Sequence, residues 1–263
     1  MTAIWREVGD RVWVRRYASL DQTIGVIGGE EGLVVIDTRA THPLADELRA
    51  DIRALGRHRL AAVVNTHGHW DHAFGNARFL PVPIWGHVRC ATMIVERGEE
   101  MRARLIPEFP DEPFDQVVLT PPSELFAESA TLDLGDRQVE LRYLGRGHTD
   151  NDIVITVADA SVLFAGDLLE NAPAPAFGDS YPIAWVETGH ALVGMVEGVV
   201  VPGHGDPFDL RFAREQVGQL AALAELAKDA ASGAIGLDEA IRRSPFPAEP
   251  TATALERVRL ELE

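Results

Sequence analysis

The sequence predicts an α/β fold in which two β-sheets pack face to face and helices cover their outer faces. Short runs of apolar and β-branched residues, bounded by glycine or polar turns, recur along the chain and are typical of strands. Segments with helical periodicity follow each set of strands, which favours layers of sheet and helix. With 263 residues and 46% hydrophobic content, the chain can bury one large core or two modest ones.

Strands are predicted wherever an apolar run of four to seven residues ends at a turn signal. The predicted strands cover residues 11–15, 23–27, 32–36, 62–64, 130–134, 139–144, 153–157, 162–165 and 199–202. The first helix is predicted after Thr41 and Pro43, which suit a helix cap and a first turn, and it should end near Gly56. A second helix is predicted over residues 88–105.

The C-terminal part of the chain is expected to be helical. Three helices are predicted over residues 211–228, 237–242 and 253–262. No tract rich in serine, glycine or charge marks a linker, so we expect one domain over residues 1–263 with a helical tail from about 210 to 263. Residues 107–122, rich in proline and aspartate, and the loop 173–181 are expected to border a substrate pocket.

Composition excludes several classes of partner. The formal charge is −17, from 41 acidic and 24 basic residues, and the basic residues are scattered, which argues against nucleic acid. Apolar runs are shorter than the roughly 18 residues that a membrane span requires. Residues 1–7 show no basic start followed by an apolar stretch, and the single cysteine Cys90 suits a reducing compartment, so a cytoplasmic location is expected.

Seven potential metal ligands follow four of the predicted strands. The run over residues 60–66 leads directly into His67, His69, Asp71 and His72. Three later runs end in the same way, and they place His148, Asp167 and His204 after Gly147, Gly166 and Gly203. Imidazole nitrogen and carboxylate oxygen are ligands that zinc accepts, and strand ends hold such side chains firmly. The pattern therefore predicts a metal site.

Seven ligands are enough for two metal ions. The first ion is expected to bind His67, His69 and His148, the second Asp71, His72 and His204, and Asp167 would bridge the two. Two zinc ions per chain would hold a bridging hydroxide and polarise the substrate oxygen that it attacks. Asp71 is the candidate catalytic residue, because its carboxylate is placed to orient the hydroxide or to pass a proton to the leaving group.

These motifs resemble the metallo-β-lactamase superfamily, whose members share a four-layer αββα sandwich with a di-metal site at one edge. The motifs occur in the family's order: Asp37, the cluster from His67 to His72, His148, Asp167 and His204. The resemblance implies that Asp37 is a buried carboxylate that supports the site without binding metal. The segment Gly147-His148-Thr149-Asp150-Asn151-Asp152 is also similar to the GHTxDN segment of the cysteine-ligated zinc β-lactamases, with one spacer residue absent.

Two departures from those lactamases bear on the substrate. Asp167 stands where they place a cysteine ligand, and His72 completes the cluster as in glyoxalase II and the lactonases. Glu170 stands where many of them carry a lysine that pairs with the carboxylate of the antibiotic, so attraction is replaced by repulsion. Efficient β-lactam hydrolysis is therefore not expected, whereas slow opening of a lactam is compatible with the sequence.

The leading hypothesis is a di-zinc hydrolase that opens an acyl bond in a small molecule, namely a lactam, a lactone or a thioester. A glyoxalase II-like thioesterase is one alternative, for which the helical tail offers the basic residues Arg211, Arg214 and Lys228. A mononuclear iron dioxygenase of the same fold is a second alternative. A non-catalytic or nucleic-acid-processing member is the third, and both the acidic charge and the complete ligand set count against it.

Overall fold

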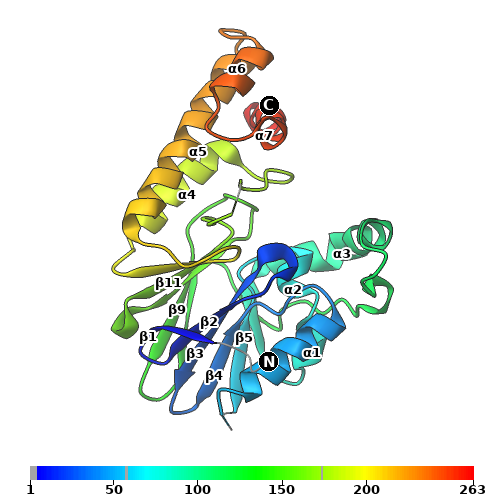
Figure 1. The fold of residues 1–263 in the computed structure, drawn as a ribbon, viewed down its shortest axis with the longest axis vertical. Helices are drawn as coiled ribbons and strands as arrows, with labels where there is room; N and C mark the ends of the chain where they lie inside the picture. The colour runs from blue at the N-terminus through cyan, green and yellow to red at the C-terminus, as the bar shows by residue number, and fades with distance from the viewer. Residues whose placement is uncertain (1–4, 57–58, 173) are drawn as a thin grey trace.

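Two β-sheets form the centre of the fold (Figure 1). The computed structural model describes residues 5–56, 59–172 and 174–263. The first sheet contains, in spatial order, β1 (Arg6–Gly9), β2 (Val12–Arg16), β3 (Thr23–Gly29), β4 (Gly32–Ile36), β5 (Leu60–Val64), β6 (Ile84–His87) and β7 (Glu124–Phe126). The second contains, in spatial order, β12 (Val199–Pro202), β11 (Val162–Gly166), β10 (Ile153–Val157), β9 (Gln138–Tyr143) and β8 (Ser129–Asp133).

Both sheets combine antiparallel and parallel pairs. Strands β1 to β4 are antiparallel neighbours, whereas β4, β5, β6 and β7 run parallel. In the second sheet, β8 to β11 alternate in direction and β12 runs parallel to β11. Parallel neighbours end at the same edge of a sheet, so β11 and β12 deliver the residues that follow them to one place.

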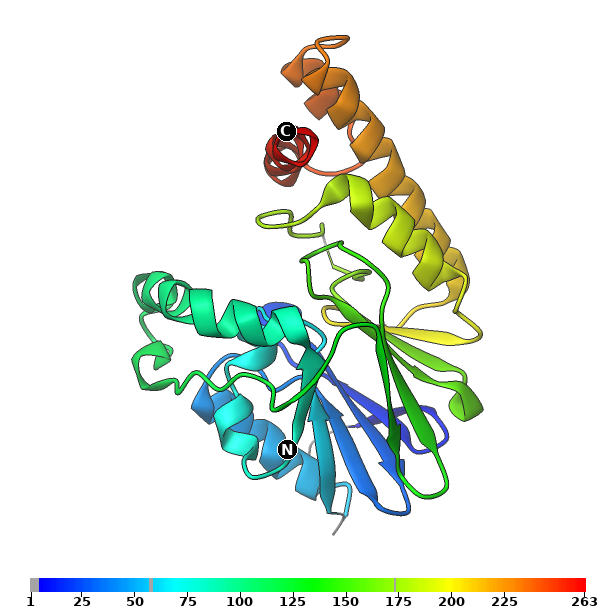
Figure 2. The same ribbon diagram turned by 180° about the vertical axis from the view of Figure 1, so that it is seen from behind.

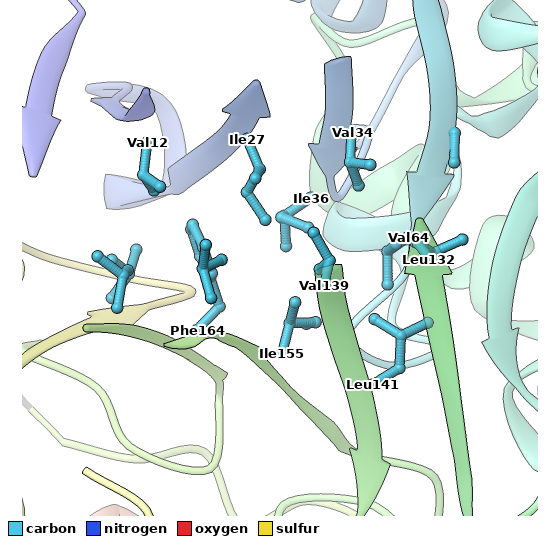
Figure 3. Close-up of a cluster of buried hydrophobic side chains, with 14 of the residues drawn as sticks. Val12, Ile27, Val34, Ile36, Val64, Leu132, Val139, Leu141, Ile155 and Phe164 are labelled. Atoms are coloured by element: carbon cyan, nitrogen blue, oxygen red, sulfur yellow. The ribbon is translucent and has the colours of Figure 1, made fainter. Parts of the chain in front are cut away.

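The inner faces of the two sheets meet in an apolar layer, part of which is shown in Figure 3. The first sheet contributes Val12, Ile27, Val34, Ile36 and Val64, and the second contributes Leu132, Val139, Leu141, Ile155 and Phe164. These side chains alternate along their strands with residues of the outer faces, because successive side chains of a strand point to opposite sides.

Helices cover both outer faces. Helix α1 (His42–Arg53) packs Leu48 and Ile52 against the outer face of the first sheet. Helices α4 (Pro182–Val193) and α5 (Leu210–Ala231) pack Trp185 and Leu220 against the second. Strands β4 and β11 are buried along their whole length, and the two-sided cover explains their continuous apolar sequences. The predicted αββα sandwich is confirmed.

The remaining helices lie at the edges of the sandwich. Helix α2 (Trp70–Ala73) is a single turn inside the histidine cluster, and α3 (Val88–Glu108) is the long helix after β6. Helices α6 (Leu237–Arg243) and α7 (Ala248–Leu262) follow α5. Short 3₁₀ turns are η1 (Ser19–Asp21), η2 (Asn76–Phe79), η3 (Phe114–Gln116) and η4 (Ala158–Ala160).

The C-terminal helices pack against one another beyond the second sheet (Figure 2). Leu226, Ala240, Leu255 and Val258 form their shared apolar core. The carboxylate of Glu261 in α7 accepts hydrogen bonds from the free backbone N–H groups of Ile183 and Ala184 at the start of α4, at 2.9 and 3.0 Å. The tail is therefore joined to the helix that covers the second sheet.

The structure adds strands that sequence patterns do not predict. Strands β1, β6 and β7 have only three or four residues, too few to establish an alternation of apolar and polar positions. Within the part of the chain that the structure describes, none of the helices is long and apolar enough to cross a membrane. The expected cytoplasmic location stays a prediction.

Candidate metal centre

The seven predicted ligands meet at one edge of the sandwich. They come from four connections: the turn after β5 carries His67, His69, Asp71 and His72, and the segments after β9, β11 and β12 carry His148, Asp167 and His204. His67, His69, His148 and Asp167 form one group, in which one ligand atom from each residue lies within 4.8 Å of the others. Asp71, His72 and His204 form a second group by the same measure.

One carboxylate oxygen lies between the two groups. Oδ2 of Asp167 is 3.7 Å from Nε2 of His67 and 3.6 Å from Nε2 of His148. The same oxygen is 3.3 Å from Nε2 of His72 and 3.4 Å from Nε2 of His204. Oδ2 of Asp167 therefore lies close to ligand atoms of both groups, and its bridging role stays a prediction.

The distances in the second group match those around a tetrahedral zinc ion. Zinc–nitrogen bonds of 2.0–2.1 Å place neighbouring tetrahedral ligands about 3.3 Å apart. Oδ2 of Asp71 lies 3.3 Å from Nε2 of His72 and 3.2 Å from Nε2 of His204, and the two histidine nitrogens are 3.2 Å apart. The three ligand atoms of this group therefore fit a zinc ion without rearrangement.

In each of the five histidines, the ring nitrogen that points away from the metal centre, here called the outward nitrogen, lies within hydrogen-bond distance of an oxygen of the protein. Nδ1 of His72 lies 2.8 Å from Asp37 Oδ2, Nδ1 of His204 lies 2.8 Å from the Leu20 carbonyl, and Nε2 of His69 lies 3.0 Å from Asp179 Oδ1. Nδ1 of His148 lies 3.2 Å from the Ala176 carbonyl, and Nδ1 of His67 lies 3.0 Å from Thr66 Oγ1. When the outward nitrogen donates, the inward one carries a lone pair, which is how metal-binding histidines are oriented.

Two buried atoms at the centre have no hydrogen-bond partner among the described residues, and both belong to predicted ligands. They are Nε2 of His67 and Oδ1 of Asp167. Burying a polar atom without a partner is unfavourable, and a metal ion relieves it. A side chain at position 203 would place a Cβ only 2.0 Å from Oδ1 of Asp167, so Gly203 keeps this space open.

Burial and nearby charged groups shift the pKa values of the histidines in opposite directions. Burial holds the pKa of His67 well below its usual value, and burial with His69 nearby lowers the pKa of His148 to about 4. Burial opposes the charge on His72 and His204 as well, but Asp167 and Asp71 outweigh it and raise both pKa values well above the usual one. The carboxylates therefore favour positive charge at the second group, where a metal cation would supply it.

A cavity of about 510 Å³ opens onto the centre. Asp71, His69, His148, Asp167 and His204 line its floor. Its walls come from η1, α2, the loop after β11 and helix α3. They include Leu20, Trp70, Arg97, Met101, Arg104, Glu170, Ala174, Ala176, Gly178 and Asp179. The loop 173–181 borders the cavity as expected, although Pro173 lies outside the described residues.

The expectation that residues 107–122 border the cavity is wrong. No described residue of 107–122 lines the cavity, and Arg97, Met101 and Arg104 of α3 form that side instead. The reason is that Phe114 and Val117 are buried in an apolar cluster with Leu105 and Met101, which holds the segment against α3.

Glu170 lies beside the second ligand group. One of its carboxylate oxygens lies within 4.8 Å of ligand atoms of Asp167 and His204, and the side chain is buried at the cavity wall. Its backbone is fixed by Gln216, which exchanges two hydrogen bonds of 2.9 and 2.6 Å with it. Burial and the adjacent Asp167 raise the pKa of Glu170 well above its usual value.

Asp179 is a site residue to which sequence patterns do not point. Besides holding His69, its carboxylate accepts a hydrogen bond of 3.4 Å from Nη1 of Arg97. His69 and the nearby His148 lower the pKa of Asp179 and outweigh its burial. The only available signal was its place in the loop 173–181, because the three residues are far apart in the sequence and meet only on folding.

A sequence profile of the metallo-beta-lactamase superfamily matches residues 20–204, which include all seven predicted ligands. The chain is 26% identical over 191 residues to a metallo-beta-lactamase type 2 from Bacillus cereus, covering 70% of this chain and 67% of that protein. It is 32% identical over 90 residues to a metallo-beta-lactamase type 2 from Bacteroides fragilis, covering 32% of this chain and 36% of that protein.

Solved structures share the fold. A metallo-beta-lactamase from Pontibacter korlensis superposes with a TM-score of 0.64 at 22% identity, covering 83% of this chain and 98% of that chain. A stereoselective inverting sec-alkylsulfatase from Pseudomonas sp. superposes with a TM-score of 0.75 at 19% identity, covering 98% of this chain but half of that one. The profile match and the ligand geometry agree, and the chain belongs to the metallo-beta-lactamase superfamily and is a metal-dependent hydrolase of that family.

Proposed function

We propose that this protein is a di-zinc hydrolase that opens an acyl bond in a small molecule. The observation that carries the proposal is the position of Asp167, whose Oδ2 lies 3.3 to 3.7 Å from nitrogens of both histidine groups. His67, His69 and His148 would hold one ion, Asp71, His72 and His204 the other, and Asp167 would join them. We propose that the chain acts as one domain, with the helical tail supporting the site.

When bound, two zinc ions supply Lewis-acid chemistry, through which water ionises near neutral pH and a carbonyl oxygen is polarised. Asp71 is the proposed catalytic residue, since its carboxylate lines the cavity floor. Its carboxylate, whose Oδ2 lies 3.3 Å from Nε2 of His72 and 3.2 Å from Nε2 of His204, would orient the attacking water through a hydrogen bond. The same carboxylate is placed to deliver the proton to the leaving atom after the acyl bond breaks.

The residues of the cavity wall favour substrates other than the common β-lactams. Several metallo-beta-lactamases are relatives of this chain, which supports a weak β-lactamase activity. The buried Glu170 lies beside Asp167, and it offers no positive charge to a substrate carboxylate at that place. An ester, lactone or thioester without a carboxylate at that place does not need such a charge.

The position of the basic tail residues does not support the glyoxalase II-like alternative. Arg211, Arg214 and Lys228 are not among the described residues that line the cavity. A sulfate ester is a second candidate substrate, because the cationic side chains Arg97 and Arg104 border the cavity. The superposition on the alkylsulfatase shows only that the fold is shared.

The experiment is a substrate panel on zinc-loaded protein: an aryl ester, a lactone, a thioester, nitrocefin and a secondary alkyl sulfate of similar size. We expect turnover of at least one carboxylic acyl substrate, slow turnover of nitrocefin, and loss of both in Asp71→Asn. Turnover of the sulfate alone would overturn the acyl proposal. Oxygen consumption by a protein that carries one iron would instead favour the dioxygenase.

A further inference from the structure

We propose that helix α3 carries a binding site for an anionic group of the substrate, so that preferred substrates have a carboxylate or a similar anion remote from the bond that breaks. The site consists of Arg97, Met101 and Arg104, which we call the α3 wall. The inference rests on the proposed function, because it assumes that the reacting bond lies at the metal centre.

The spacing of the three residues places them on one face of the helix. Positions 97, 101 and 104 are separated by four and three residues, which brings successive side chains to the same side of an α-helix. All three line the cavity that opens onto the metal centre. With a rise of 1.5 Å per residue, the two arginines are about 10 Å apart along the helix axis. The α3 wall can therefore contact the extended part of a substrate.

The two arginines differ in their partners. Nη1 of Arg97 lies 3.4 Å from Oδ2 of Asp179, so its charge is partly balanced. No carboxylate of the described residues lies within 4.0 Å of the Arg104 guanidinium, and its side chain is exposed at the cavity. Arg104 is thus the cationic group that is available to a ligand, and its planar guanidinium binds a carboxylate through two parallel hydrogen bonds.

The carboxylates that line the cavity have partners of their own. Glu170 lies with Asp167 and His204, whereas Arg97 reaches Asp179 at the His69 side. Asp21 also lines the cavity, but Arg16 pairs with it. The charge of Arg104, which no carboxylate of the described residues balances, therefore attracts an anionic group of the substrate to α3. That attraction would orient the substrate relative to the metal centre.

Two esters that differ only in charge test the proposal: 4-nitrophenyl hexanoate and the 4-nitrophenyl monoester of adipic acid. We expect the ratio of their kcat/KM values to favour the anionic ester in the wild type. Arg104→Met should lower that ratio about five- to tenfold, mainly through KM of the anionic ester. Arg104→Glu should lower it further, and both changes should affect kcat/KM of the anionic ester much more than that of the neutral ester, because only the anionic ester has a charge for position 104 to contact.

Arg102→Met is the matched control. Arg102 lies on the same helix and carries the same charge, but it is not among the cavity residues and it bonds to the Val117 carbonyl. Its loss should leave the ratio unchanged. Added salt should reduce the ratio in the wild type and in Arg102→Met but not in Arg104→Met, because salt screens the exposed charge.

Calorimetric binding of adipate and of hexanoate to the zinc-loaded proteins gives a readout that is independent of turnover. Tighter binding of adipate that disappears in Arg104→Met supports the α3 wall even if neither ester is hydrolysed, in which case only the proposed acyl hydrolysis fails. Hydrolysis of both esters with a ratio insensitive to Arg104 overturns the α3 wall and leaves the hydrolase. Equal binding of both acids in all variants, without hydrolysis, overturns both proposals.

Discussion

The carboxylate of Asp37 lies 2.8 Å from Nδ1 of His72, and it also accepts hydrogen bonds of 2.8 Å from the backbone N–H and the hydroxyl of Thr66. Asp37 follows β4 with a left-handed backbone, at φ 65°, and is almost fully buried. Because it holds Nδ1, it turns Nε2 of His72 toward Asp71, Asp167 and His204. Asp37 thus links the ends of β4 and β5 to His72 of the second ligand group.

Asp37→Asn should weaken metal binding at the second group. The amide keeps the shape but presents an N–H where His72 and Thr66 need an acceptor, so we expect about 10- to 100-fold weaker binding of one zinc ion. Zinc titration with a competing chelator measures this. Asp111→Asn, an exposed position, is the control, and equal affinities in the two variants would contradict the positioning role of Asp37.

The purified protein should contain close to two zinc equivalents. Seven side chains offer ligand atoms in two groups, and Nε2 of His67 and Oδ1 of Asp167 are buried without a hydrogen-bond partner among the described residues. Removal of the metal with a chelator should lower Tm by at least about 5 °C, since an ion that binds only the folded state stabilises it. Elemental analysis that finds a single iron and no zinc would reject this assignment.

Changes at positions 167 and 170 should separate metal binding from lactam recognition. Asp167→Ala should remove at least one zinc ion and most hydrolysis, because the shared oxygen is lost. Asp167→Cys should retain metal but gain little activity on nitrocefin, since Glu170 stays beside it. Adding Glu170→Lys should raise nitrocefin turnover about tenfold. If Glu170→Lys slows the reaction, this carboxylate does not limit lactam recognition.

Arg257 of α7 should support the loop that holds His69. Its Nε donates to the Ser180 carbonyl at 2.8 Å, and Nη2 donates to the Asp179 carbonyl at 3.3 Å. Arg257→Ala should reduce unfolding free energy by about 1–3 kcal/mol and weaken zinc binding severalfold. Arg259→Ala removes an arginine of the same helix that pairs only with Glu263 among the described residues. If Arg257→Ala and Arg259→Ala change stability and zinc affinity equally, Arg257 is not a specific anchor of the loop.

Asp152 should make the metal-free protein less stable at high pH. Burial raises its pKa to about 7, while Oδ2 accepts a hydrogen bond of 2.6 Å from the Thr149 N–H. The folded state therefore holds a proton that the unfolded state releases above about pH 4, so this residue's contribution falls as pH rises toward 7. Asp152→Asn should gain about 1–3 kcal/mol at pH 8 and almost nothing at pH 4. Denaturant unfolding of the wild type and of Asp152→Asn at pH 4 and pH 8 measures the difference.

The sequence by itself determined the ligand types and the strands that carry them. The apolar runs that lead to His67, Asp167 and His204 reveal strand ends, because burial on both faces requires continuous apolar residues, whereas the strand before His148 alternates and has one exposed face. The same patterns predict the two sheets and their helical cover. These features depend on neighbours in the sequence, where periodicity and turn residues are visible.

Only the tertiary structure decided how the side chains meet. The central place of Asp167 Oδ2, the bond from Asp179 to His69 and the exposure of Arg104 depend on segments that are distant in sequence. Residues 107–122 contain the same proline and aspartate signals as a pocket loop, yet Phe114 draws them against α3. Packing of distant apolar side chains selects among the positions that a loop can adopt, and a local pattern does not contain that information.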